Sequence, residues 1–179
     1  MSKAVLISIR PKWCEKIARG EKTVEIRKTR PKIETPFKCY AYRTKGVVKH
    51  IAKGEWFDMP VGGTVFGEFT CDRITPLFNV CTDNWHHLAG DVHEWHKELV
   101  KRACLTDAEL KAYAKGQNCF AWHISDLKIY DTPKKLSKFS RPFEICIGKV
   151  CDEYGCAYCE NGSHIKRPPQ SWCYVEELT

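Results

Sequence analysis

The sequence contains no uninterrupted apolar run of about 18 residues, the length that a membrane-spanning helix needs. Its first residues, MSKAVLISIRPKW, lack an apolar stretch that ends in a cleavage site, so we expect no secretion signal. Internal repeats and low-complexity tracts are absent as well. These absences exclude a helical membrane protein and a repeat array, and they favour a cytoplasmic protein with no membrane partner.

Acidic residues are the less frequent charged class, since 29 Lys and Arg outnumber 22 Asp and Glu and give a net charge of +7. The excess modestly favours a polyanionic partner, although many ordinary protein surfaces are equally basic. The chain has eleven cysteines. Without a secretion signal a reducing compartment is expected, where Cys39, Cys71 and Cys119 would pack as small hydrophobic groups inside apolar strand patterns. A chain of 179 residues with 43% hydrophobic content can bury one core and carry an appendage.

Residues 9–28 are the stretch around which the chain is organised. Pro11 is predicted to open a short helix, because the first helical position needs no N–H. Gly20 is predicted to end that helix in a left-handed conformation. The strand that follows has a period of two, so Val24 and Ile26 face one side. The polar residues on the other side are Thr23, Glu25 and Arg27.

The segment Gly20-Glu-Lys22-Thr-Val-Glu25-Ile-Arg27 resembles the GxKxxExR signature of ASCH domains, and the resemblance extends over residues 3–131. ASCH domains are similar to the PUA RNA-binding fold. The resemblance implies an α+β fold, a PUA-like small β-barrel with flanking helices. It further implies that RNA, a nucleotide or a modified nucleoside binds in a polar pocket at the mouth of the barrel.

The same resemblance leaves an enzyme as the alternative. Some bacterial ASCH proteins hydrolyse the acyl amide of N4-acetylcytidine with the motif lysine, a residue three later and a downstream glutamate; others resemble ribonucleases. By this likeness Lys22 would be a nucleophile or proton donor, with Glu25 as base or orienter. The sequence departs from that subfamily, because Glu25 replaces a threonine and Arg102 and Ala103 stand where the glutamate is expected. A purely structural role, in which Glu25 and Arg27 hold each other or Arg10 in place, is the further alternative.

Basic and aromatic residues predict nucleic-acid contacts, because cations bind phosphates and aromatic rings stack on unpaired bases. The alternative is a solvated basic face with the aromatic residues in the core. Residues 45–60 are expected to form an ordered binding loop and residues 132–142 a basic connector. The predicted nucleic-acid-binding residues are Arg10, Lys12, Arg27, Lys53, Trp56, Lys134, Lys135 and Lys138.

The C-terminal tail contains Cys151-x4-Cys156-x2-Cys159-x4-His164, a spacing that suits tetrahedral zinc. A short polar segment without a core needs such a cross-link, although free thiols or a disulfide are alternatives. The tail also resembles phage and bacterial ASCH proteins in which a Cys-x2-Cys recurs with a tryptophan-flanked cysteine. That likeness predicts structural zinc on Cys151, Cys156, Cys159 and Cys173, with His164 or Cys146 as alternative fourth ligand.

The predicted domains are therefore a barrel domain at 1–131, the connector at 132–142 and a zinc-binding tail at 143–179. A phage or host accessory protein whose zinc module docks another protein is the third functional alternative.

Overall fold

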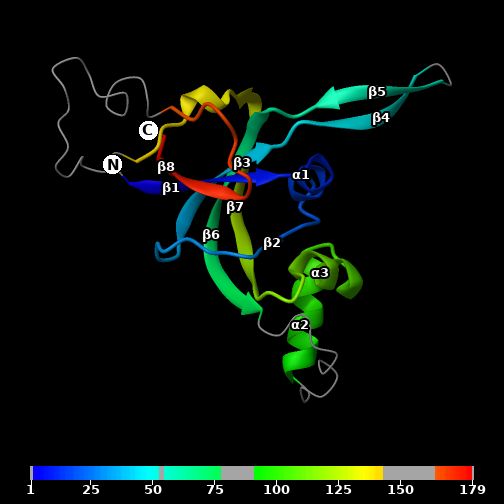
Figure 1. Ribbon diagram of the computed structural model, residues 1–179, viewed down its shortest axis with the longest axis vertical. Helices are drawn as coiled ribbons and strands as arrows, with labels where there is room; N and C mark the ends of the chain where they lie inside the picture. The colour runs from blue at the N-terminus through cyan, green and yellow to red at the C-terminus, as the bar shows by residue number, and fades with distance from the viewer. Residues whose placement is uncertain (1, 53–54, 78–90, 143–163, 179) are drawn as a thin grey trace. The chain divides into compact units, whose positions relative to one another are not determined.

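The computed structural model describes residues 2–52, 55–77, 91–142 and 164–178 (Figure 1), and for 48–52, 55–57 and 91–94 it describes the backbone alone. The fold combines strands and helices, which confirms the predicted α+β class. The chain divides into two compact units: unit 1 is residues 1–14, 38–69 and 128–179, and unit 2 is residues 15–37 and 70–127. None of the described helices is long and apolar enough to cross a membrane.

In unit 1 the strand β1 (Lys3–Ile9) lies between two partners that come from distant parts of the sequence. It pairs in parallel with β3 (Phe37–Arg43) and antiparallel with β8 (Trp172–Glu176), which Figure 1 shows alongside β1. The first part of β6 (Thr64–Leu77) pairs with β3 on the opposite side. The C-terminal residues thus complete the sheet of this unit.

The core of unit 1 explains why the C-terminal segment belongs to it. Tyr40, Phe139 and Val175 are buried in one apolar cluster, and the rings of Tyr40 and Phe139 lie 4.9 Å apart. The predicted division at residues 131 and 142 therefore differs from the structure. The strand β7 (Cys119–Lys134) continues into the predicted connector, and a short 3-10 helix, η2 (Leu136–Lys138), follows it.

Residues 45–60, predicted to be a binding loop, instead form an antiparallel hairpin of β4 (Gly46–Ala52) and β5 (Glu55–Val61) that extends away from β3 (Figure 1). The loop prediction is wrong because β-branched residues such as Val47 and Ile51 favour extended backbone, and each strand satisfies the other's peptide groups. Lys53 lies outside the described residues. The backbone of Trp56 lies opposite Ile51.

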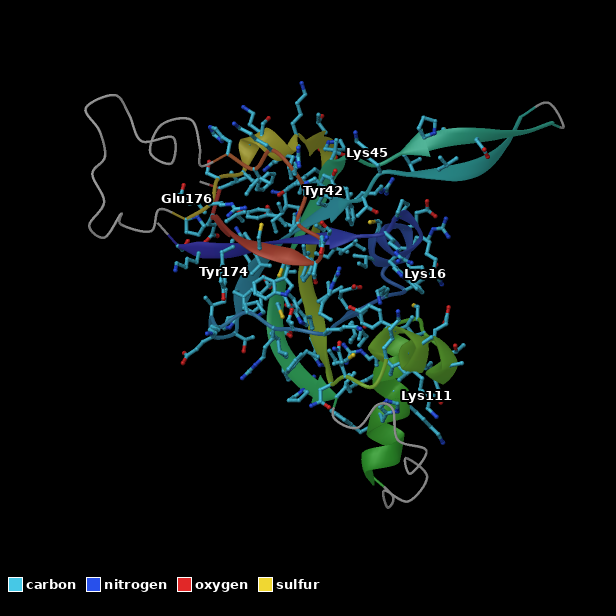
Figure 2. The ribbon with its side chains drawn as sticks, in the orientation of Figure 1. Lys16, Tyr42, Lys45, Lys111, Tyr174 and Glu176 are labelled. Atoms are coloured by element: carbon cyan, nitrogen blue, oxygen red, sulfur yellow. The ribbon has the colours of Figure 1, made fainter. Side chains whose placement is uncertain are left out.

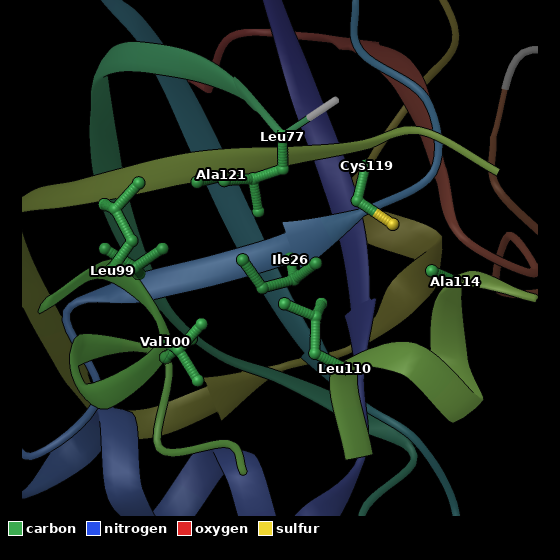
Figure 3. Close-up of a cluster of buried hydrophobic side chains, with 10 residues drawn as sticks. Ile26, Leu77, Leu99, Val100, Leu110, Ala114, Cys119 and Ala121 are labelled. Carbon is green, nitrogen blue, oxygen red and sulfur yellow. The ribbon is translucent and has the colours of Figure 1, made fainter. Parts of the chain in front are cut away.

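Unit 2 packs the motif strand against two helices. β2 (Val24–Arg27) pairs antiparallel with β7, and Val24 and Ile26 turn into a cluster with α2 (Asp91–Arg102) and α3 (Asp107–Ala114), as Figure 3 shows for Ile26. The predicted alternation of β2 is thereby confirmed. No strand pairing that would close a barrel is shown among the described residues, so the predicted barrel is not established.

The helix starts and stops expected from the sequence are present. α1 (Pro11–Ala18) begins at Pro11, and Gly20 has a φ of +74°. α3 begins with a capping box, in which the Thr106 hydroxyl accepts from the Glu109 N–H at 3.2 Å and the Glu109 carboxylate accepts from the Thr106 N–H at 2.9 Å.

Candidate functional site on the motif strand

Lys22 is positioned by the end of α1. The left-handed Gly20 reverses the chain, and the carbonyl oxygen of Lys16 then accepts from the backbone N–H groups of Glu21 at 2.9 Å and of Lys22 at 3.1 Å. These bonds satisfy a helix-terminal carbonyl and place the motif lysine two residues before the start of β2.

The side chain of Lys22 is buried, with an exposed fraction of 3%. Its Nζ donates to the carbonyl oxygen of Ala103 at 2.7 Å and lies 3.3 Å from Oε2 of Glu25. Ala103 directly follows α2, where helical carbonyls lack backbone partners and the helix dipole favours a cation. Lys22 therefore caps α2, and its side chain is buried instead of open to a pocket, as a nucleophile or proton donor would need to be.

Glu25 lies between the two cations of the motif. Its Oε1 is 3.2 Å from Nη2 of Arg27, and the side chains of Glu25 and Arg27 are 8% and 10% exposed. Oε2 contacts Lys22 as an ion pair but accepts no hydrogen bond from any described residue. The Arg27 guanidinium, predicted to bind nucleic acid, is thus already engaged by a carboxylate. Buried charges need such pairing to be tolerated.

Aromatic residues share the sheet face of Glu25 and Arg27. In the β2–β7 register Trp122 lies opposite Glu25 and Phe120 opposite Arg27. Trp122 is fully buried and meets Phe37 edge-on at 5.8 Å. Neither Trp122 nor Phe120 was among the residues predicted from the sequence to form the site. The signal was the aromatic alternation of residues 119–123, but only the register shows which residues of β2 they face.

Two cations lie over aromatic rings where the chain leaves β2. The guanidinium carbon of Arg30, an exposed residue, is 5.9 Å from the ring centre of the half-buried Phe120. Nζ of Lys28 is 5.6 Å from the ring centre of Tyr113, which is 39% exposed. Cation–π attraction at exposed sites contributes about 0.5–1 kcal/mol, which favours keeping these cations beside the two rings.

The opposite face of β7 in unit 2 holds a buried histidine. Nε2 of His123 is 2.9 Å from the Thr75 hydroxyl, and its Nδ1 is 3.3 Å from the Arg73 guanidinium. Burial, the largest cause, and the positive charges of Arg73 and Arg102 together lower the pKa of His123 to about 4. His123 is therefore neutral near pH 7.

We expect this histidine to make the protein less stable in acid. Its folded pKa lies below the ordinary value of about 6.5, so between about pH 6.5 and pH 4 the unfolded chain binds a proton that the folded chain does not. Stability conferred by neutral His123 should fall over this window by roughly 2–3 kcal/mol. Urea unfolding at pH 7 and pH 4.5 should show a smaller loss for His123→Gln than for wild type. An identical loss in both proteins would contradict the assignment.

Most cations predicted to contact nucleic acid in unit 1 are open to solvent. Arg10, Lys12, Lys135 and Lys138 are exposed, and Nζ of Lys12 lies 4.1 Å from the ring centre of Trp13. The half-buried Lys134 lies 4.2 Å from the ring centre of Tyr130.

The predicted zinc ligands Cys146, Cys151, Cys156 and Cys159 lie outside the described residues. Cys173 lies on β8 opposite Leu6 and packs against the core of unit 1, where burial raises the pKa of its thiol. The exposed His164 has its Nδ1 3.1 Å from the Ser140 hydroxyl. Within the described ranges, no three His, Cys, Asp or Glu residues come together in a way that could hold a metal.

We propose that the tail binds one zinc ion per chain through its Cys-x2-Cys pair. Zinc needs deprotonated thiols, and burial raises the pKa of the Cys173 thiol, so we expect the Cys-x2-Cys pair to supply ligands before Cys173 does. Elemental analysis should give about one equivalent for wild type and for Cys104→Ser, and less than about a tenth for Cys156→Ser/Cys159→Ser. Cys173→Ser then decides whether the buried thiol is a ligand. Wild-type protein that is purified without added metal and contains less than about a tenth of an equivalent of zinc would contradict the proposal.

Solved structures of an ASCH protein from Zymomonas mobilis share this fold. The crystal structure titled as ASCH from that organism has a TM-score of 0.58 at 18% identity and covers 97% of this chain and 88% of its own. The structure of a serine-to-alanine variant has a TM-score of 0.57 at 18% identity and covers 97% of this chain and 89% of its own. The structure of a tyrosine-to-phenylalanine variant has a TM-score of 0.52 at 20% identity and covers 75% of this chain and 77% of its own. No family model and no curated protein matches the sequence. The likeness confirms the ASCH fold predicted from the motif.

Proposed function

We propose that this chain, which has the ASCH fold, binds single-stranded RNA or a modified nucleoside at the face of unit 2 built on the motif strand. The observation that carries the proposal is the placement of cations over partly open aromatic rings, the exposed Arg30 over Phe120 and the half-buried Lys28 over Tyr113. Unpaired bases stack on aromatic rings, and neighbouring cations attract their phosphates.

The geometry of Lys22 supports a binding protein over a hydrolase. A lysine acting as nucleophile or proton donor needs to reach its substrate. Here the residue is 3% exposed, and its ammonium donates to the carbonyl of Ala103 and pairs with Glu25. Ala103 is also one of the residues that stand where the amidohydrolase relatives are expected to have a glutamate. The motif residues therefore have a structural role beside the aromatic face, because Arg27 and Glu25 lie opposite Phe120 and Trp122 in the strand register.

Phe120→Ala is the direct test of this face. Stacking one base contributes about 1–3 kcal/mol, so we expect RNA affinity to fall by roughly 5- to 100-fold. Arg30→Ala should weaken binding less, because it removes a cation but leaves the ring. Tyr174→Ala is the matched control, since Tyr174 carries its own cation, Lys3 at 5.8 Å, on a strand of unit 1. Equal RNA affinities of wild type and a well-folded Phe120→Ala protein would refute the proposal.

Binding should also depend steeply on salt, because the net charge of +7 includes exposed lysines along η2 and its flanks. Replacing Lys135 and Lys138 with alanine should reduce the slope of log affinity against log salt by about two, without changing sequence preference. Fluorescence titrations with a uridine and an adenosine oligomer at several salt concentrations measure both quantities. A flat salt dependence in wild type would contradict an electrostatic contribution.

A further inference from the structure

A cluster of cations, Arg10, Arg43 and Lys45, lies in unit 1 at the carboxyl ends of the parallel strands β1 and β3. Ile9 and Arg43 are partners in the register, and the backbone N–H of Thr44 donates to the carbonyl oxygen of Ile9 at 2.9 Å. Arg10, which follows Ile9, therefore leaves the sheet at the same end as Thr44 and Lys45.

The turn between β5 and β6 closes against this end. The N–H of Gly63 donates to the carbonyl oxygen of Arg43 at 2.8 Å. Gly62 has a φ of +87°, and a Cβ there would collide with the carbonyl oxygen of Thr44, so glycine is required for the approach. The side chain of Lys45 passes beside Gly63, with Cε 3.4 Å from the position of a Cβ. Figure 2 shows Lys45 at the base of the β4–β5 hairpin.

Arg43 has an unusual environment for a half-buried cation. Its guanidinium carbon lies 5.5 Å from the ring centre of the buried Phe66. Its Nε is buried and donates to no described group, and no described carboxylate forms an ion pair with this residue. A buried charged donor without an acceptor is costly, and the arginine fork matches the oxygens of a phosphate.

The surrounding charges are of one sign. The segments 9–13, 43–47 and 61–66 contribute Arg10, Lys12, Arg43 and Lys45 and contain no Asp or Glu. Arg10 and Lys45 are exposed. An anion at Arg43 would therefore meet further cations and no carboxylate from these segments.

We propose that this cluster binds a backbone phosphate of single-stranded nucleic acid, with Arg43 as the bidentate ligand and Arg10 and Lys45 flanking it. The inference rests on the proposed RNA binding for its choice of ligand. It concerns a base-independent contact within unit 1, separate from the base-stacking contact proposed for unit 2. Phe66 acts as the platform that orients the guanidinium.

An abasic phosphodiester oligomer is the probe, because it carries phosphates but no bases to stack. Arg43→Gln should weaken its binding about tenfold and lower the salt slope by about one. Lys45→Gln, at an exposed position where folding is not at stake, should weaken it several-fold, and Lys166→Gln is the matched control at an exposed cation of the same unit. The Nε–H resonance of Arg43 should shift when the oligomer is titrated into wild-type protein.

The outcomes separate the two proposals. Oligouridylate binding that depends on Phe120, with an unmoved Arg43 resonance and unchanged affinity in both glutamine variants, would overturn the phosphate site alone. Abasic-oligomer binding that depends on Arg43, with no contribution from Phe120 to oligouridylate affinity, would support the phosphate site and refute the base-stacking face. Arg43→Lys should recover only part of the lost affinity, because it restores the charge but not the fork.

Discussion

Replacing Glu25 with alanine is expected to lower the free energy of unfolding by about 3–5 kcal/mol, because it leaves two buried cations without their shared carboxylate. Oε1 and Oε2 of Glu25 lie 3.2 Å from Arg27 and 3.3 Å from Lys22. Chemical denaturation of the purified variant measures the loss. Glu25→Gln keeps the shape and loses the charge, so its effect should be intermediate.

Glu21→Ala is the matched control, four residues earlier in the same segment. Glu21 pairs with Lys16 at 3.1 Å, but the two side chains are 44% and 41% exposed. Exposed ion pairs contribute less than about 1 kcal/mol, so this variant should unfold almost like wild type. If both alanine variants unfold at the same denaturant concentration, the buried ion pairs of Glu25 do not stabilise the fold more than the exposed pair of Glu21.

Lys22→Ala is expected to be the second most damaging change, with a loss of about 3 kcal/mol, because it removes the α2 cap and one of Glu25's two counter-charges. Lys22→Met fills the volume but supplies no charge, so it should recover little of the loss. The experiment compares thermal and urea unfolding with RNA affinity, measured at a temperature where the variants remain folded.

Coupling between the two residues provides an independent check. The Lys22→Ala/Glu25→Ala protein should lose less stability than the sum of the single losses, because each single change strands a charge that the other removes. A Lys22→Ala protein that unfolds like wild type and yet loses its ligand would instead assign Lys22 the functional role predicted from the motif, and would remove the structural one.

The structure also changes how the motif is understood. Within unit 2 its lysine, glutamate and arginine interact with one another and with the end of α2. The surface that we propose as the ligand-binding face is formed instead by Phe120 and Arg30. A substitution in the motif should therefore affect binding through stability, whereas Phe120→Ala should affect binding directly, and comparing the two classes of variant separates these routes.

Several features were determined by the sequence itself because they depend on neighbours within a few residues. Pro11 opens α1, Gly20 adopts the left-handed conformation after it, and Thr106 and Glu109 form a capping box, each for a local steric or hydrogen-bonding reason. The alternation of β2 likewise placed Val24 and Ile26 in the core cluster of unit 2. Local conformational preference and periodicity are readable without knowledge of the fold.

The tertiary structure alone decided which residues meet across long stretches of sequence. Lys22 is buried because its ammonium donates to the carbonyl of Ala103, which follows α2 and lies 81 residues later in the sequence. Likewise, β8 near the C-terminus pairs with β1 near the N-terminus. The register of β2 with β7 placed Phe120 and Trp122 beside Arg27 and Glu25. Such contacts depend on strand order and helix packing, whose energy is shared over many residues, so no short motif encodes them. The motif determined that charges would gather at β2, and the packing of α2 and β7 decided that they would be buried.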